Sequence, residues 1–281
     1  RKYMKTKLLY LLLFVCSYSY AQIPTNGLIG NYEFTNGVYT DAANGAIFTQ
    51  TGTALTNVND RFTVANNAIG LNGDYLTRTN INYPNSGTDL DSGTISFWIK
   101  TTTNDSNIRT ILDDTAGRSN ATTDNTWAGY YFYLKDGKVG VSGRVEYSNS
   151  ESYKGIGKLS AYKINDNSWH HVLATIRRDQ RFTGASDIAG AYVTLYVDGV
   201  SQGSSGVTKI NSLAGGGINL RQSLDTNGNI TIANNRTNDL PDANRYFDEI
   251  DDINIYGRRV TQAEATQLAT VNSFCFPPQV S

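Results

Sequence analysis

The stretch Ala191-Tyr192-Val193-Thr194-Leu195-Tyr196-Val197-Asp198-Gly199-Val200 decides the fold of this chain. Its apolar residues Val193, Leu195 and Val197 stand at every second position, which is the period of a β-strand with one face in a core. Asp198-Gly199 follows at once, and both residue types tolerate the positive φ angles of a two-residue hairpin turn. The stretch therefore predicts an antiparallel hairpin.

The same period of two recurs along the chain on both sides of this hairpin. A second Asp-Gly pair, Asp136-Gly137, predicts another hairpin between two extended runs. Parallel strands would need crossover helices, and no such helices alternate with the strand patterns. The sequence therefore predicts an antiparallel β-sandwich, with further strands at residues 28–34, 94–100, 108–113, 129–134, 138–146, 169–178, 229–234 and 247–256.

Helical periodicity is confined to one short segment near the C-terminal end. Thr261 and Glu264 have the spacing of a capping box, in which each side chain binds the backbone amide of the other residue. We expect this helix to run from Thr261 to about Ala269 and to pack Ala265 and Leu268 against the sandwich.

Composition and charge limit the classes of function. The 281 residues include 26 Gly and 18 Tyr, and only 17% are charged, which suits many short strands joined by polar turns. The net charge is -1 and the folded part contains no block of Lys and Arg, so the sequence offers no means of neutralising nucleic-acid phosphates. One sandwich domain over residues 22–270 is expected, because β-sandwiches often use more than 200 residues for one core.

Both ends of the chain carry patterns of their own. Lys5 and Lys7 precede the apolar run 8–15, and Ser19-Tyr20-Ala21 provides small residues for cleavage before Gln22, so residues 1–21 are predicted to be a secretory signal peptide. No later segment approaches the roughly 20 apolar residues of a membrane helix, and we expect a secreted or cell-surface protein. Residues 271–281 contain the remaining cysteine, either a buried free thiol or half of an intermolecular bridge, and resemble a linker towards a downstream module.

A set of segments, in their order along the chain, resembles the laminin-G-like jelly-roll domains of the concanavalin A-like lectin/glucanase superfamily. The resemblance covers about residues 27–269 and implies an all-β, two-sheet antiparallel jelly-roll sandwich with one short C-terminal helix. Such domains occur in surface adhesins and as accessory modules of carbohydrate-active enzymes, and the Tyr-rich and Asn-rich composition is similar to that of Bacteroidetes proteins. The segments that carry the resemblance are residues 27–34, 41–45, 94–100, 169–172, 193–199 and 247–256.

Catalysis is not expected from the residues present. Glu249-Ile250-Asp251 resembles the start of the Glu-x-Asp-x-x-Glu strand of retaining glycanases, which need two carboxyl groups about 5 Å apart. Asn254 stands at the place of the second glutamate and cannot transfer a proton. His170 and His171, the only two histidines, are adjacent in a strand and should point to opposite faces, so they cannot ligate one metal ion together. We expect no catalytic residue.

The resemblance also implies one structural Ca²⁺ ion where the first and last strands meet. Calcium prefers oxygen ligands, and Asp251 on the last strand is the expected ligand, with Glu33 or Asp41 contributed by the first strands. The alternative is that Asp251 accepts hydrogen bonds from a neighbouring turn without any ion.

Aromatic side chains near the long polar loops are the candidates for ligand binding. Sugar CH groups stack on aromatic rings, and polar side chains bind the sugar hydroxyls. Trp127 ends a polar loop and is the first candidate, followed by Tyr130, Tyr147 and Tyr153. Next to Tyr130, residues 131 and 133 are both tyrosines and should share the opposite strand face.

Three functions fit these observations. The first is a non-catalytic recognition module that binds a glycan or another cell-surface ligand. The second is a polysaccharide hydrolase or lyase on the same sandwich, and the third is a structural spacer within a surface array. A pair of close carboxylates, or a cluster of His, Tyr and Arg on one sheet, would favour the enzyme, and the sequence contains no motif for either.

Overall fold

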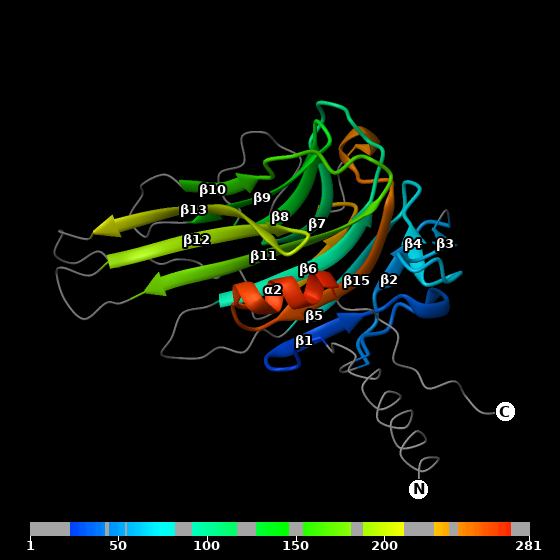
Figure 1. Ribbon diagram of the computed structural model, residues 1–281, viewed down its shortest axis with the longest axis horizontal. Helices are drawn as coiled ribbons and strands as arrows, with labels where there is room; N and C mark the ends of the chain where they lie inside the picture. Colours follow the sequence, from blue (N-terminus) through cyan, green and yellow to red (C-terminus); the bar gives the residue numbers. More distant parts are fainter. Residues whose placement is uncertain are drawn as a thin grey trace, which may run out of the picture.

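The computed structural model describes residues 23–42, 45–53, 55–81, 92–116, 128–145, 154–180, 188–210, 228–235 and 241–270. These residues form two antiparallel sheets that pack face to face, with one α-helix (Figure 1). The predicted two-sheet β-sandwich is therefore confirmed. The predicted signal peptide (1–21) and the C-terminal segment with Cys275 (271–281) lie outside the described residues.

The first sheet has eight strands in the order β13-β12-β11-β6-β15-β4-β3, and β1 also pairs with β15. The strands are β1 (Leu28–Tyr32), β3 (Thr56–Val58), β4 (Ala68–Gly70), β6 (Ser92–Lys100), β11 (Trp169–Gln180), β12 (Ile188–Val197), β13 (Val200–Ile210) and β15 (Glu249–Tyr256).

The second sheet has seven strands in the order β10-β9-β8-β7-β14-β5-β2. The strands are β2 (Thr49–Thr51), β5 (Tyr75–Ile81), β7 (Arg109–Ala116), β8 (Ala128–Lys135), β9 (Lys138–Val145), β10 (Lys154–Leu159) and β14 (Gly228–Ile232). Two short 3-10 helices, η2 (Thr35–Gly37) and η3 (Asp242–Asn244), lie in the connections.

The core lies between the two sheets and follows the period of two. Ile95, Phe97 and Ile99 of β6 are buried in it, as their alternation predicts. The ring of Phe97 meets that of Phe132 from the other sheet edge-on, with centroids 5.0 Å apart. Trp98, between Phe97 and Ile99, therefore points to the outer face of the eight-stranded sheet.

Both predicted hairpin turns are confirmed. Asp136 and Gly137 have φ angles of 52° and 73°, and Asp198 and Gly199 have φ angles of 51° and 74°. Two central residues with positive φ match the right-handed twist of the flanking strands. The turns join β8 to β9 and β12 to β13 in tight register.

The predicted helix is α2 (Gln262–Thr270), and its capping box is confirmed. The backbone N–H of Glu264 donates to Thr261 Oγ1 (3.2 Å), and the N–H of Thr261 donates to Glu264 Oε2 (2.7 Å). Ala265 and Leu268 are buried against Leu173 and Tyr256, so α2 covers part of the outer face of the eight-stranded sheet (Figure 1). No helix among the described residues is long and apolar enough to cross a membrane.

One strand is not among those expected from the sequence. β10 forms an edge of the seven-stranded sheet, although the sequence pattern predicts no strand between residues 146 and 169. Gly155 and Gly157 flank Ile156, which is the core residue of this strand. A strand with a single core side chain between glycines shows no period in its sequence.

Candidate functional site

One row of side chains crosses the whole outer face of the seven-stranded sheet. Each member lies next to core residues of its own strand, such as Phe132 or Ile230, and therefore points away from the core. Seven strands about 4.8 Å apart make the row about 29 Å long. This polar row consists, in register from β2 to β10, of Thr49, Thr77, Thr231, Asp113, Tyr131, Ser142 and Gly157. Thr231 and Asp113 are fully buried, and Gly157 contributes no side chain.

Two tyrosines of β8 form the aromatic part of this face. The rings of Tyr131 and Tyr133 are partly exposed, their centroids are 5.6 Å apart and their planes are tilted by 41°. Tyr133 lies directly over Gly140 of β9, where a Cβ atom would come within 2.4 Å of the Tyr133 Cζ atom. Only glycine leaves room for the ring to lie against the strand, so Gly140 sets the position of this platform.

Polar groups flank the aromatic platform on the neighbouring strands. Thr110 of β7 lies opposite Tyr133, and Asp113 lies opposite Tyr131. Burial, and secondarily the nearby Tyr131, raises the pKa of the Tyr133 hydroxyl, which therefore remains protonated at neutral pH. Thr110 and Asp113 are fully buried, so the accessible part of the platform consists of the two rings and their phenol hydroxyls, which can donate hydrogen bonds.

The sequence prediction of ligand-binding residues is corrected in part. Tyr130 is 1% exposed and belongs to the core, so it does not offer its ring to a ligand. Tyr131 and Tyr133 share the opposite face, as their spacing predicts. Trp127, Tyr147 and Tyr153 lie outside the described residues. Tyr131 and Tyr133 alternate with the core residues Phe132 and Leu134, whereas Tyr130 has the same parity as those core residues, and this alternation is the signal that distinguishes the surface tyrosines from the core one.

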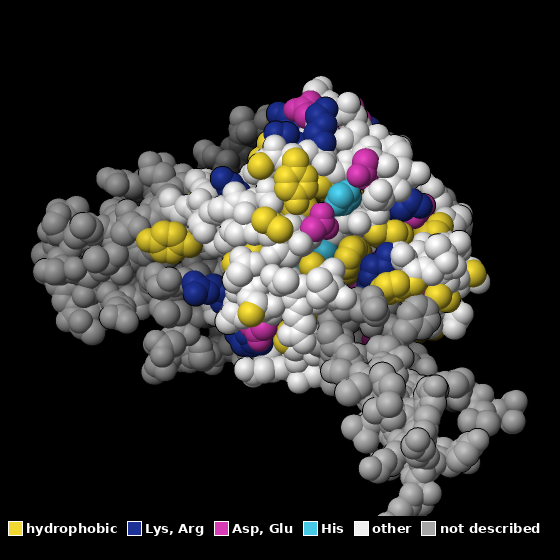
Figure 2. All heavy atoms as spheres, viewed as in Figure 1, with side chains coloured by type: hydrophobic (Ala, Val, Ile, Leu, Met, Phe, Trp, Pro, Cys, Tyr) yellow, Lys and Arg dark blue, Asp and Glu magenta, His cyan; other side chains and the backbone are white. Residues whose placement is uncertain are grey.

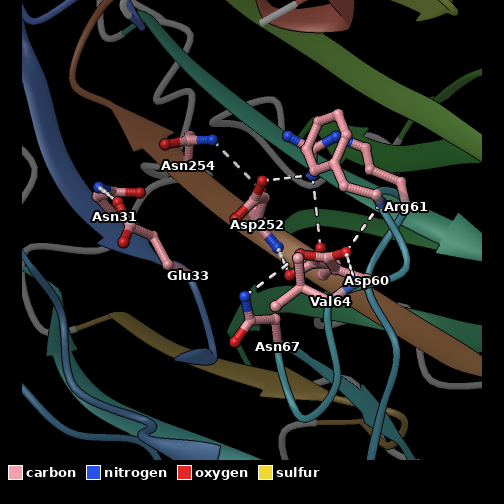
Figure 3. Close-up of polar contacts among 10 residues, drawn as sticks. Asn31, Glu33, Asp60, Arg61, Val64, Asn67, Asp252 and Asn254 are labelled. Carbon is pink, nitrogen blue, oxygen red and sulfur yellow. Dashed lines mark hydrogen bonds and ion pairs between the residues drawn. The ribbon is translucent and has the colours of Figure 1, made fainter. Parts of the chain in front are cut away.

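On the opposite sheet, a cluster of carboxylates surrounds Arg61 (Figure 3). Arg61 Nη1 lies 3.4 Å from Asp251 Oδ2 and 2.5 Å from Asp252 Oδ2. Asp60, in the same loop as Arg61, accepts hydrogen bonds from the backbone N–H groups of Phe62 (2.8 Å) and Val64 (2.9 Å). All three carboxylates are buried or nearly so, and Arg61 is their common cationic neighbour.

The residues predicted to bind calcium do not form one site. Asp41 accepts from Arg78 Nη1 (3.4 Å) and from the backbone N–H of Asn31 (2.9 Å), whereas Asp251 is paired with Arg61. Glu33 accepts from Asn31 Nδ2 (3.1 Å). Among the described residues, no three or more His, Cys, Asp or Glu side chains are placed to hold a metal ion. The carboxylates named for calcium thus do not fit a shared ion, and calcium binding itself stays a prediction.

The two histidines have different surroundings. His171 is fully buried, its ring lies 5.2 Å from that of Trp98, and burial lowers its pKa to about 3. His170 lies between Asp198 (Nδ1–Oδ2, 2.8 Å) and Asp166 (Nε2–Oδ1, 3.1 Å), and these hydrogen bonds, that of Asp198 first, raise its pKa. Figure 2 shows the histidine side chains among acidic and hydrophobic ones on this face. His170 is thus held by two carboxylates, and the neutral ring of His171 packs against Trp98.

The strand compared with glycanases also carries structural contacts. Glu249 accepts from Lys100 Nζ (3.0 Å), and Asn254 Nδ2 donates to the backbone oxygen of Asp252 (3.2 Å). Glu249 thus pairs with a lysine. Asn254, which stands where a glycanase strand would have its second glutamate, carries an amide that cannot transfer a proton.

Solved structures with a similar fold come from different classes of protein. Domain 4 of AbnA, a GH43 extracellular arabinanase from Geobacillus stearothermophilus solved with arabinotriose, matches with a TM-score of 0.54 and 16% identity, over 86% of this chain and 98% of that one. The botulinum neurotoxin serotype D ligand binding domain, solved with N-acetylneuraminic acid, matches with a TM-score of 0.51 and 16% identity, over 87% of this chain and 50% of that one.

A third similar structure is the binding domain of Paraclostridial Mosquitocidal Protein 1, with a TM-score of 0.51, 20% identity and coverage of 87% of this chain and 52% of that one. This chain thus spans about half the length of the toxin domains. At these identities the likeness concerns the fold alone. Among curated protein sequences, none matches the chain significantly.

The sequence also matches a family model. The laminin-G model described as "Concanavalin A-like lectin/glucanases superfamily" matches residues 72–266, which span β5 to the middle of α2 and include most strands of both sheets. The match agrees with the two-sheet architecture and with the order of the motifs along the chain. The chain therefore belongs to the concanavalin A-like lectin/glucanases superfamily.

Proposed function

We propose that this protein is a carbohydrate-binding domain and that its glycan lies on the outer face of the seven-stranded sheet, over Tyr131 and Tyr133. The observation that carries the proposal is the pair of partly exposed rings, 5.6 Å apart, one of which lies against a glycine. Aromatic rings of this kind accept the CH faces of sugars, while the phenol hydroxyls form hydrogen bonds at the edge.

Accessible polar side chains lie on the same face as the platform. Ser142 of β9 lies opposite Tyr131 and is partly exposed, and Thr49 of β2 is exposed at the far end of the polar row. Their hydroxyls can donate and accept hydrogen bonds, as the recognition of sugar hydroxyls requires.

The similar structures support a carbohydrate ligand. Two of them were solved with arabinotriose or N-acetylneuraminic acid, and the match covers 98% of the arabinanase domain but 50% of the toxin domain, so the arabinanase domain is the closer support for a sugar ligand on this fold. The fold alone does not define function, and for this reason the proposal depends on the tyrosine platform. We further propose export to the cell surface or medium, on the evidence of the N-terminal sequence pattern.

A binding screen of the purified protein against polysaccharides and oligosaccharides tests the proposal. Tyr131→Ala and Tyr133→Ala should each weaken the affinity about tenfold or more, which is about 1.4 kcal/mol. Tyr162→Ala is the matched control, because Tyr162 is 39% exposed and donates to Val197 of the other sheet. Unchanged affinity in both platform variants would refute the proposed face. Release of products from a polysaccharide would instead indicate an enzyme.

A further inference from the structure

The backbone of β15 is shaped so that two consecutive carboxylates meet one cation. In a regular strand Asp251 and Asp252 would point to opposite faces. Here the register with β6 shifts between Asp251 and Asn254, and Asp252 has a φ of 44°, in the left-handed region. This bulge turns both carboxylates towards Arg61 Nη1. Bulges and left-handed residues of this kind occur where a strand redirects a side chain to a specific contact.

The cation at this point is held on several sides. The Arg61 guanidinium lies 4.5 Å from the ring centroid of Phe62 and 4.5 Å from that of Trp98. The Arg61 side chain is only 7% exposed. Its loop is fixed by Asp60, which accepts from Phe62, Val64 and Asn67 (Figure 3). The guanidinium is thus enclosed between two aromatic rings and two carboxylates.

The charges explain why a cation is required here. Asp251 and Asp252 are 1% and 9% exposed, and Arg61 Nη1 lies within ion-pair distance of both carboxylates. Glu33 and Asp60 add negative charge near Asp252. Without Arg61, the two buried negative charges would repel each other and have no cationic partner, which is strongly destabilising.

We propose that Arg61 is a built-in cation that takes the place of a metal ion at Asp251 and Asp252. The wild-type fold then has no need of calcium at this point, although the family resemblance predicts one there. Removing the guanidinium should open a site for a cation with oxygen ligands, such as Ca²⁺ or Tb³⁺. This site lies on the sheet opposite the proposed glycan face, so either proposal can fail without the other.

Arg61→Met tests the proposal, because methionine keeps an apolar stem between Trp98 and Phe62 but carries no charge. Melting temperature and Tb³⁺ luminescence excited through tryptophan are measured in Ca²⁺ and in EDTA. A Tb³⁺ ion in place of the guanidinium would lie next to the Trp98 ring, so emission reports on this site. Wild-type protein should melt at the same temperature in both solutions and give no sensitised emission.

Arg61→Met should melt lower than wild type in EDTA and gain about 5–10 °C at a Ca²⁺ concentration one hundred times the dissociation constant. It should also give Tb³⁺ emission, and Asp251→Asn with Asp252→Asn in the same chain should abolish both responses. Arg258→Met is the control, because Arg258 is paired with the single carboxylate of Glu264 and should lose stability without any metal response.

Two results would overturn the proposal. One is a rise in the wild-type melting temperature with Ca²⁺ that Asp251→Asn removes, since a metal would then bind with Arg61 present. The other is a folded Arg61→Met protein that responds to neither metal. If Arg61→Met does not fold in EDTA, recovery of its circular dichroism in Ca²⁺ supports the proposal, and failure to fold in both solutions overturns it.

Discussion

Replacing Gly140 with alanine moves the Tyr133 ring without removing it. An ideal Cβ atom at position 140 would lie 2.4 Å from Tyr133 Cζ and 2.6 Å from its hydroxyl oxygen. Carbon atoms at optimal separation are about 3.5–4.0 Å apart. The ring must therefore lift from β9 by about 1 Å. The core, the strand pairing and the tyrosine itself all remain, so the change tests ring position alone.

Two opposing terms determine the stability of this variant. Alanine in place of a strand glycine stabilises by about 0.5–1 kcal/mol, and a side chain forced about 30° from its rotamer loses about 0.5–1.5 kcal/mol. Gly140→Ala should therefore change the free energy of unfolding by less than about 1 kcal/mol. Gly155→Ala on the adjacent strand β10 is the matched control, because an added Cβ there meets nothing within 4 Å. It should be stabilised by about 0.5–1 kcal/mol.

Urea denaturation and glycan affinity together provide the readout. Gly140→Ala should bind the glycan about tenfold more weakly, which is about 1.4 kcal/mol, while Gly155→Ala should bind like the wild type. A loss of more than about 3 kcal/mol of stability in Gly140→Ala would mean that the ring is locked in the packing and cannot yield as reasoned. Full affinity in Gly140→Ala alongside lost affinity in Tyr133→Ala would refute the dependence on ring position.

Three further predictions concern the two histidines and the helix cap. Hydrogen bonds to Asp198 and Asp166 raise the pKa of His170, so the protonated ring stabilises the fold fully below about pH 6.5, and this stabilisation is lost as the pH rises through the raised pKa. His170→Gln should remove this pH dependence of the free energy of unfolding in urea titrations. An unaltered pH profile in the variant would contradict the prediction. Burial lowers the pKa of His171 to about 3, so at pH values under about 6.5 the unfolded chain binds a proton that the folded protein does not. The free energy of unfolding should therefore decrease by up to about 1.4 kcal/mol for each pH unit of acidification, and His171→Gln should lack this decrease. Thr261→Ala should lose about 1 kcal/mol with the cap, whereas Thr270→Ala at the helix end should stay within about 0.5 kcal/mol in the same assay.

The long strands were predictable because each buries several alternating side chains. In β6, β11 and β12 the period of two selects the residues that enter the core. The strands β2, β3 and β4 were missed because each has three residues, too few to display a period. Their place in the sheets comes from pairing: β2 pairs with β5, β4 pairs with the distant strand β15, and β3 pairs with β4.

The sequence by itself determined the features that depend on residues close together in the chain. These are the faces of the long strands, the two Asp-Gly turns and the capping box at Thr261, because periodicity and local backbone preference act over a few residues. The tertiary structure alone decided which charges meet. Arg61 and Asp251 are 190 positions apart, and the bulge that turns Asp252 to the same guanidinium has no sign in the local pattern. The antiparallel sandwich and the shared face of Tyr131 and Tyr133 could thus be inferred from alternation, whereas the Arg61 cation between Asp251 and Asp252 arises from contacts between a strand and a distant loop.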